Sequence, residues 1–184
     1  MTIIALAMLT GGIALAQANP GEGNPSGDVP PTGQLQPQAS NLSAGDRTFI
    51  DKAASTNFAQ IKLGQLAVRN GTTAQVRDLG QKMIDDHTKA NDQLKPIALR
   101  EGIRLPTEPT SEQKADYDRL SALSGDAFNK AYMDLVKGDQ KQAISLFQDE
   151  ARDGVDPQLK TFAKNTLPEL RQHHDLASRR VQKM

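Results

Sequence analysis

The stretch that decides the fold is TTAQVRDLGQKMIDDHTKANDQLKPIALREG, residues 72–102. Its core-type side chains recur at intervals of three and four residues, which places them on one face of an α-helix. Thr72, followed three residues later by Gln75, is a typical helix start, and Gly102 is a typical stop. The sequence therefore predicts a helix over about residues 73–101, with a stripe made of Val76, Leu79, Met83, His87, Ala90 and Leu94.

Three more long segments carry the same helical period. They span about residues 44–69, 126–152 and 156–181, and a shorter helix is predicted over about residues 112–123. No segment shows the two-residue alternation of β-branched side chains that strands require. The sequence therefore predicts an all-α fold.

The lengths of the connections suggest how the helices are arranged. The links at residues 70–72 and 153–156 are short, so each predicts an antiparallel pair of helices. The link between the second and third long helices has about 24 residues, enough to run back along the bundle. We expect a ferritin-like four-helix bundle over residues 43–184, with a long crossover between helices 2 and 3. An up-down-up-down bundle with a decorated loop is the alternative.

The N-terminal region has a different composition. An apolar run over residues 3–16 ends in the small-x-small patterns at residues 14–16 and 16–18, which predicts a signal peptide over residues 1–18. This run is shorter than the roughly 17–25 residues of a membrane anchor, so we expect no transmembrane span in the mature chain. Residues 19–42 are rich in Pro and Gly and predict a disordered linker. We expect a periplasmic or otherwise exported protein.

Composition narrows the range of functions. Lys and Arg number 22, Asp and Glu number 22, and aromatic residues are 4% of the chain, so the sequence gives no reason to expect a nucleic-acid partner. No Cys is present, which excludes disulfides and thiolate metal sites. The sequence has no Gly-rich phosphate loop, no Gly-x-Ser-x-Gly elbow and no His-Glu-x-x-His helix. These observations favour a non-catalytic protein.

Polar residues interrupt the apolar stripes near the middle of each long helix. Because paired helices bring them to similar heights, we expect a buried mid-bundle hydrogen-bond network. Alternatively, His87 and His173, with Asp139 or Asp86, could hold one Zn, Cu or Fe ion. A ferritin-like carboxylate site would need Glu three residues before each His, and those positions hold other residues. The predicted mid-bundle cluster consists of Gln60, His87, Asp139, Gln140 and His173.

Four stretches of the sequence carry a family resemblance. FAQIKLGQLA (58–67), VRDLGQKMIDDHTKANDQL (76–94), LSGDAFNKAYMDLV (123–136) and LPELRQHHDLA (167–177) resemble the DUF4142 family of exported bacterial proteins. The resemblance implies export and a fold similar to ferritin. His87 and His173 match the family pattern, whereas Gln60 and Gln140 stand where the family usually has Glu and His.

Two functional hypotheses follow. The first is a non-catalytic exported helical bundle of the bacterial envelope, acting with a partner there in envelope maintenance or stress tolerance. The second is a metal-binding or redox protein that uses the mid-bundle histidines.

Overall fold

The computed structural model describes residues 42–179, and these residues form helices and their connections without any strand. The all-α prediction is therefore confirmed. The predicted signal peptide and the predicted linker lie outside the described residues, apart from Leu42, which packs into the core. The helices are α1 (Ala44–Asn70), α2 (Ala74–Arg100), α3 (Ser111–Ser121), α4 (Gly125–Asp153) and α5 (Pro157–Ser178).

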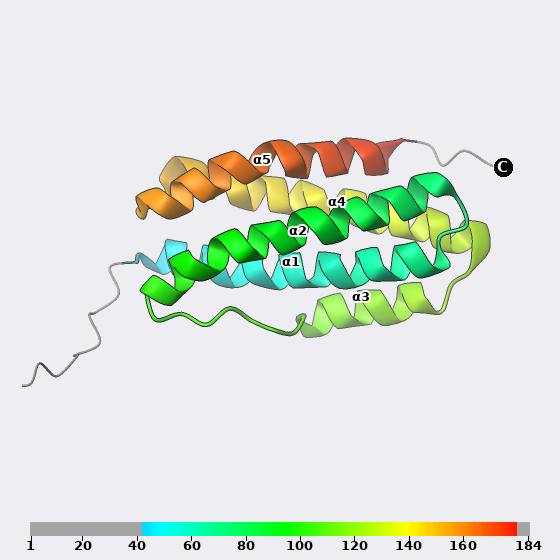
Figure 1. Ribbon diagram of the computed structural model, residues 1–184, viewed down its shortest axis with the longest axis horizontal. Coiled ribbons are helices and arrows are strands. Elements are labelled where there is room, and N and C mark those ends of the chain that lie inside the picture. The colour runs from blue at the N-terminus through cyan, green and yellow to red at the C-terminus, as the bar shows by residue number, and fades with distance from the viewer. Residues whose placement is uncertain (1–41, 180–184) are drawn as a thin grey trace, which may run out of the picture. The chain divides into compact units, whose positions relative to one another are not determined.

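The helices pack as two antiparallel pairs, α1 with α2 and α4 with α5 (Figure 1). At one end of α1, the backbone N–H of Thr72 donates to Asn129 Oδ1 at the start of α4, over 3.1 Å. At its other end, Asp46 accepts from the backbone N–H of Val155, just beyond α4, over 2.9 Å. Helix α4 therefore runs antiparallel to α1 and in the same direction as α2. The connection from α2 to α4, which contains α3, returns along the length of the bundle.

Local sequence explains where the helices begin. Ser43 and Asp46 form a reciprocal capping box at the start of α1. Helix α2 is capped by Thr73, one residue later than we predicted, because the Thr73 hydroxyl accepts from the N–H of Val76. Helix α5 is capped by the side chain of Asp156.

Two glycines allow α1 and α2 to approach closely. A Cβ atom added to Gly64 would lie 2.6 Å from the carbonyl oxygen of Gly80, and one added to Gly80 would lie 2.8 Å from Cβ of Ala67. Both distances are well below ordinary contact, so only glycine permits this spacing of the helices.

None of the helices within residues 42–179 contains an apolar stretch long enough to span a membrane.

The core has two apolar clusters at different levels of the bundle. One contains Phe49, Phe147 and Phe162, whose rings meet with centroids 5.0 to 6.2 Å apart. The other contains Phe128 and Tyr132, whose rings stack at 6.1 Å. Between these levels, each long helix contributes polar side chains, and these form the candidate site.

Candidate functional site

A layer of polar side chains crosses the bundle between the two apolar clusters. Most of these side chains are almost completely buried, with exposed fractions of 0% to 2%. Asp139 is the exception and is half-buried. Burying amides and imidazoles is costly unless they find hydrogen-bond partners, so their partners define what the layer can do. We use the name polar layer for Asn57, Gln60, His87, Asp139, Gln140 and His173.

His87 has a partner at each ring nitrogen, and both partners are uncharged amides. Its Nδ1 lies 2.9 Å from Asn57 Oδ1, and its Nε2 lies 3.3 Å from Gln140 Nε2. Asn57 Oδ1 can only accept and the Gln140 amide nitrogen can only donate, so His87 carries its proton on Nδ1. Burial, with His173 adding to it, lowers the pKa of His87 to about 3 despite the opposing charge of Asp86. His87 is therefore neutral and fully hydrogen-bonded.

His173 has a charged partner on one side only. Its Nε2 donates to Asp86 Oδ2 over 2.7 Å, and the same carboxylate oxygen is 2.9 Å from Lys82 Nζ. Its other nitrogen, Nδ1, is buried without a hydrogen-bond partner among the described residues. Burial lowers the pKa of His173, although Asp86 opposes that shift, so the neutral ring presents an unused lone pair. The rings of His173 and His87 lie 5.3 Å apart.

Gln60 and Asp139 form the third part of the layer. Gln60 Nε2 donates to Asp139 Oδ2 over 2.7 Å. The other atom of that amide, Gln60 Oε1, is buried and has no hydrogen-bond partner within the described chain, and the same holds for Gln140 Oε1. Burial raises the pKa of Asp139 to about 6; Gln60 opposes the shift, and the nearby carboxylates of Asp116 and Glu112 add to it.

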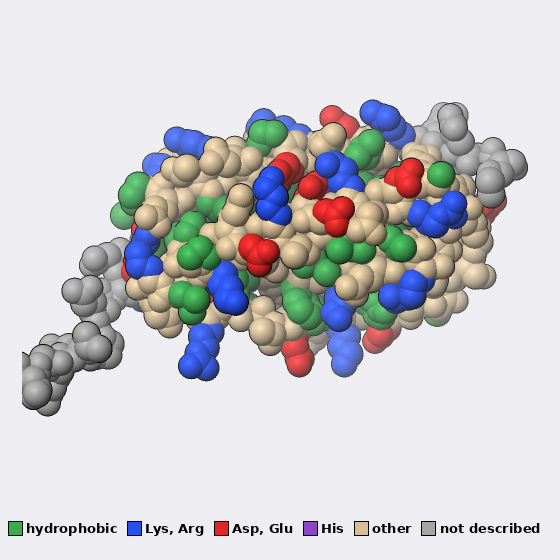
Figure 2. Space-filling model, in the orientation of Figure 1, with side chains coloured by type: hydrophobic (Ala, Val, Ile, Leu, Met, Phe, Trp, Pro, Cys, Tyr) green, Lys and Arg blue, Asp and Glu red, His purple; other side chains and the backbone are tan. Residues whose placement is uncertain are grey.

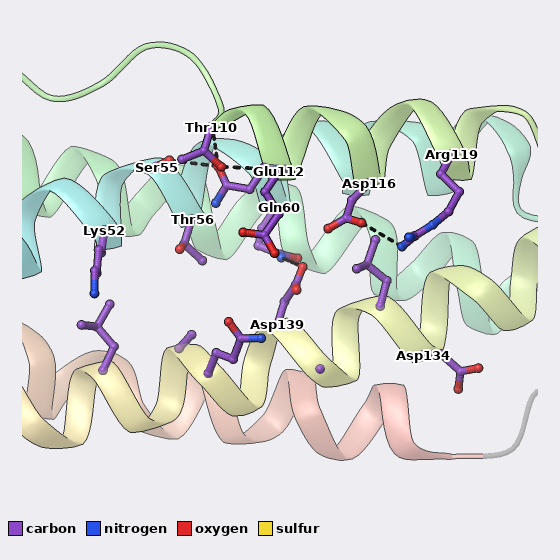
Figure 3. Close-up of a pocket in the computed structure, with 16 residues that line it drawn as sticks. Lys52, Ser55, Thr56, Gln60, Thr110, Glu112, Asp116, Arg119, Asp134 and Asp139 are labelled. Atoms are coloured by element: carbon purple, nitrogen blue, oxygen red, sulfur yellow. Dashed lines mark hydrogen bonds and ion pairs between the residues drawn. The ribbon is translucent and has the colours of Figure 1, made fainter.

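A surface cleft reaches the polar layer at Asp139. It has a volume of about 590 Å³ and lies between α1, α3 and α4. Figure 3 shows Gln60 and Asp139 joined in its middle, with Glu112 and Asp116 of α3 along one side. Asp116 is paired with Arg119 over 2.8 Å. We call this space the cleft; it connects solvent with the half-buried side of the polar layer.

Comparison with known proteins identifies the family. A family model described as "Domain of unknown function (DUF4142)" matches residues 31–179. The chain belongs to the DUF4142 family. The crystal structure of a DUF305 fragment from Deinococcus radiodurans is similar in fold, with a TM-score of 0.65 at 14% sequence identity, covering 74% of this chain and 94% of that chain. No curated protein matches the chain.

In this DUF4142 protein, the residues of the predicted cluster lie at one level of the bundle. Gln60 pairs with Asp139, Gln140 pairs with His87, and the ring of His173 lies beside that of His87. The structure does not assemble His87, His173 and Asp139 as three ligands of one ion. Both nitrogens of His87 are engaged by amides, and residues 42–179 contain no group of three or more His, Cys, Asp or Glu side chains that could hold a metal.

Our sequence interpretation missed two members of the network. Asn57 and Asn91 form a pair in which Asn57 Nδ2 donates to Asn91 Oδ1 over 3.0 Å, and this pair orients His87. The available signal was the three-residue spacing between Asn57 and Gln60, which places both amides on one face of α1.

Proposed function

We propose that this chain is a non-catalytic helical bundle, ferritin-like in topology, that is exported to the bacterial envelope. There it acts through its surface, with an envelope partner, in envelope maintenance or stress tolerance. The observation that carries the non-catalytic part is the environment of His87. A general base needs a free nitrogen, access to substrate and a pKa near the working pH. His87 has both nitrogens engaged, is 2% exposed and has its pKa lowered to about 3.

The proposed export rests on the signal-peptide pattern of residues 1–18 and on the resemblance described above. The surface drawn in Figure 2 has no predominance of one charge sign, so it gives no reason to expect a strongly charged partner. On the face drawn in Figure 2, Lys and Arg side chains are interspersed with Asp and Glu, and hydrophobic side chains lie between them. Mixed surfaces of this kind suit a protein that remains dispersed in an aqueous compartment.

Export is tested by producing the full chain with its own N-terminus in a Gram-negative bacterium. We expect the protein in the periplasmic fraction, with an intact mass that corresponds to cleavage after Ala16 or Ala18. The matched control lacks residues 2–16 and should remain in the cytoplasm. Full-length protein that retains Met1 in the cytoplasm would contradict the proposal.

A metal-binding or redox role is the second candidate, and His173 is the observation that favours it. Metal-ligating histidines usually donate their second nitrogen to a carboxylate, which orients the ring and increases its basicity. The Nε2–H of His173 donates to Asp86, and its Nδ1 has no hydrogen-bond partner in the part of the chain that the structure describes. His87 and Asp139 are the other ligands of this candidate, which therefore requires His87 to release an amide partner and Asp139 to release Gln60 when an ion binds.

Thermal melts with added Zn, Cu or Fe ions, together with elemental analysis, separate the two candidates. A non-catalytic bundle should melt at the same temperature with and without each ion. Stabilisation that grows with metal concentration, and that is lost in His173→Ala, would support the metal candidate instead. Asp175→Asn, which changes an exposed carboxylate on the same helix, is the control.

A further inference from the structure

The cleft between α1, α3 and α4 has a surplus of acidic side chains. Four carboxylates and two basic side chains line it. Two of the carboxylates are already paired, Asp116 with Arg119 and Asp134 with Lys130. The carboxylates that remain are Asp139 and Glu112, which face the middle of the cleft, and they outnumber the one remaining basic side chain, Lys52 (Figure 3). The hydrogen bond that Asp139 receives comes from Gln60, which is a neutral amide and does not balance the charge. The interior of the cleft therefore favours a positive charge.

Gln60 supplies an independent reason to expect a ligand. Its side chain is 1% exposed and lines the cleft, and its Oε1 has no hydrogen-bond partner among the described residues. The amide cannot simply be rotated to remove this problem. Rotation would place Oε1 against the ionised Asp139 carboxylate and leave Nε2 without an acceptor. A buried acceptor without a donor is unfavourable, and a group that supplies a donor at this point would be stabilised.

We propose that the cleft binds a small organic amine, whose ammonium group donates to Gln60 Oε1 and lies among the carboxylates of Asp139 and Glu112. An ammonium group carries three N–H donors and a positive charge, so it meets both requirements at once. The cleft volume of about 590 Å³ accommodates an aliphatic chain together with water.

An inorganic cation fits the same site less well. A hard divalent cation takes several oxygen ligands within about 2.0–2.6 Å, which requires carboxylates that converge on one point. Residues 42–179 contain no group of three or more Asp, Glu, His or Cys side chains so arranged. Glu112 and Asp116 are spread along one turn of α3, and Asp139 faces them from α4. A linear diamine can instead place its second ammonium near the outer carboxylates.

The test is titration of the full chain with 1,4-diaminobutane at pH 7.5, followed by calorimetry and by the NMR signals of the Gln60 side-chain amide. We expect saturable binding with a shift of the Gln60 amide signals. Asp139→Asn should weaken binding at least about tenfold, because it removes a charge-assisted contact. Glu112→Gln should weaken it about threefold, because Glu112 is exposed. This second variant changes a surface residue and should leave the fold intact.

Asp118→Asn is the matched control, because Asp118 is an exposed carboxylate on the same helix that does not line the cleft. It should change the affinity less than about twofold. Butane-1,4-diol should not bind. The proposal is overturned if wild type shows no saturable binding, if Asp118→Asn weakens binding as much as Glu112→Gln, or if Gln60 is unaffected at saturation. It is also overturned if Mg²⁺ or Ca²⁺ binds more tightly than the diamine with the same dependence on Asp139.

Discussion

His87 and His173 are two buried histidines whose rings lie 5.3 Å apart, yet they have different chemistry. Their exposed fractions are 2% and 1%, so burial does not distinguish them. His87 is held by two neutral amides, whereas His173 is held by one carboxylate, and its other nitrogen has no hydrogen-bond partner within residues 42–179. The number and charge of the partners decide the role of each ring. His87 is a structural element, and His173 is the ring with spare hydrogen-bonding capacity.

The same difference predicts unequal costs of substitution. Removal of His87 leaves two buried groups, Asn57 Oδ1 and Gln140 Nε2, without partners. Removal of His173 takes one hydrogen-bond partner from Asp86 alone, and Asp86 is partly exposed and still paired with Lys82.

His87→Ala should destabilise the protein by about 3–5 kcal/mol, because it creates a cavity and leaves two buried polar groups unpaired. His87→Leu refills most of the volume and should cost about 2 kcal/mol, which reflects mainly the unpaired amides. Urea denaturation measures both values. If both variants unfolded at the wild-type midpoint, His87 would not be part of a buried network.

Acidification should reveal the neutral state of His87. The unfolded chain takes up a proton near the ordinary His pKa of 6.5, whereas folded His87 resists protonation until about 3. The unfolded state therefore binds more protons in this window, and stability is lost as the pH falls from about 6.5 to 3. The full loss should be about 5 kcal/mol, measured by urea unfolding at several pH values. The curve of His87→Leu should be flatter, and curves of equal slope would contradict the assignment.

Glu150 should partly cancel the effect of His87 on the pH dependence of stability, so substituting Glu150 makes the contribution of His87 easier to measure. Burial raises the pKa of Glu150 to about 7, and the neighbouring Asp46 carboxylate adds to the shift. The folded state therefore keeps a proton that the unfolded state loses near 4.5, and stability is lost as the pH rises from about 4.5 to 7. This sign is opposite to that of His87.

Glu150→Gln should remove the opposing contribution. Between pH 4.5 and 7, the stability of this variant should rise by about 2 kcal/mol relative to wild type. Asp149→Asn, which changes an adjacent exposed carboxylate, is the control and should follow the wild-type curve. If Glu150→Gln also followed that curve, Glu150 would be ionised in the folded protein.

The sequence was sufficient to predict the helices and the level of the polar layer. The spacing of apolar residues in α1, α2, α4 and α5 determines which face of each helix is buried. Counting along paired helices then places Gln60, His87, Gln140 and His173 at similar heights. These predictions depend on helical periodicity alone, which is a strong signal over segments of this length.

The partners within the layer could not be predicted in the same way. Asp86 and Asp139 were both plausible neighbours of His173, and only the rotation of α2 against α5 brings Asp86 to Nε2. The cleft depends on where α3 lies, but α3 has Leu120 as its one buried residue and therefore carries almost no apolar pattern. Its position is set partly by two polar contacts with α1. Ser55 Oγ donates to Gln113 Oε1 over 2.9 Å, and Arg69 donates to the Tyr117 hydroxyl over 3.3 Å.

The smallest effect is expected at His173. His173→Leu should change stability by less than about 1 kcal/mol, because Asp86 keeps Lys82 as a partner and the volume is refilled. The substitution also removes Nδ1, a buried nitrogen that has no partner among residues 42–179, and this offsets part of the lost hydrogen bond to Asp86. Urea denaturation of His173→Leu and His87→Leu under the same conditions compares the two rings directly. Equal costs would show that burial, and not the number of partners, governs both histidines. A smaller cost at His173 would show that this ring can be replaced without loss of the bundle, as expected for the ring with spare hydrogen-bonding capacity.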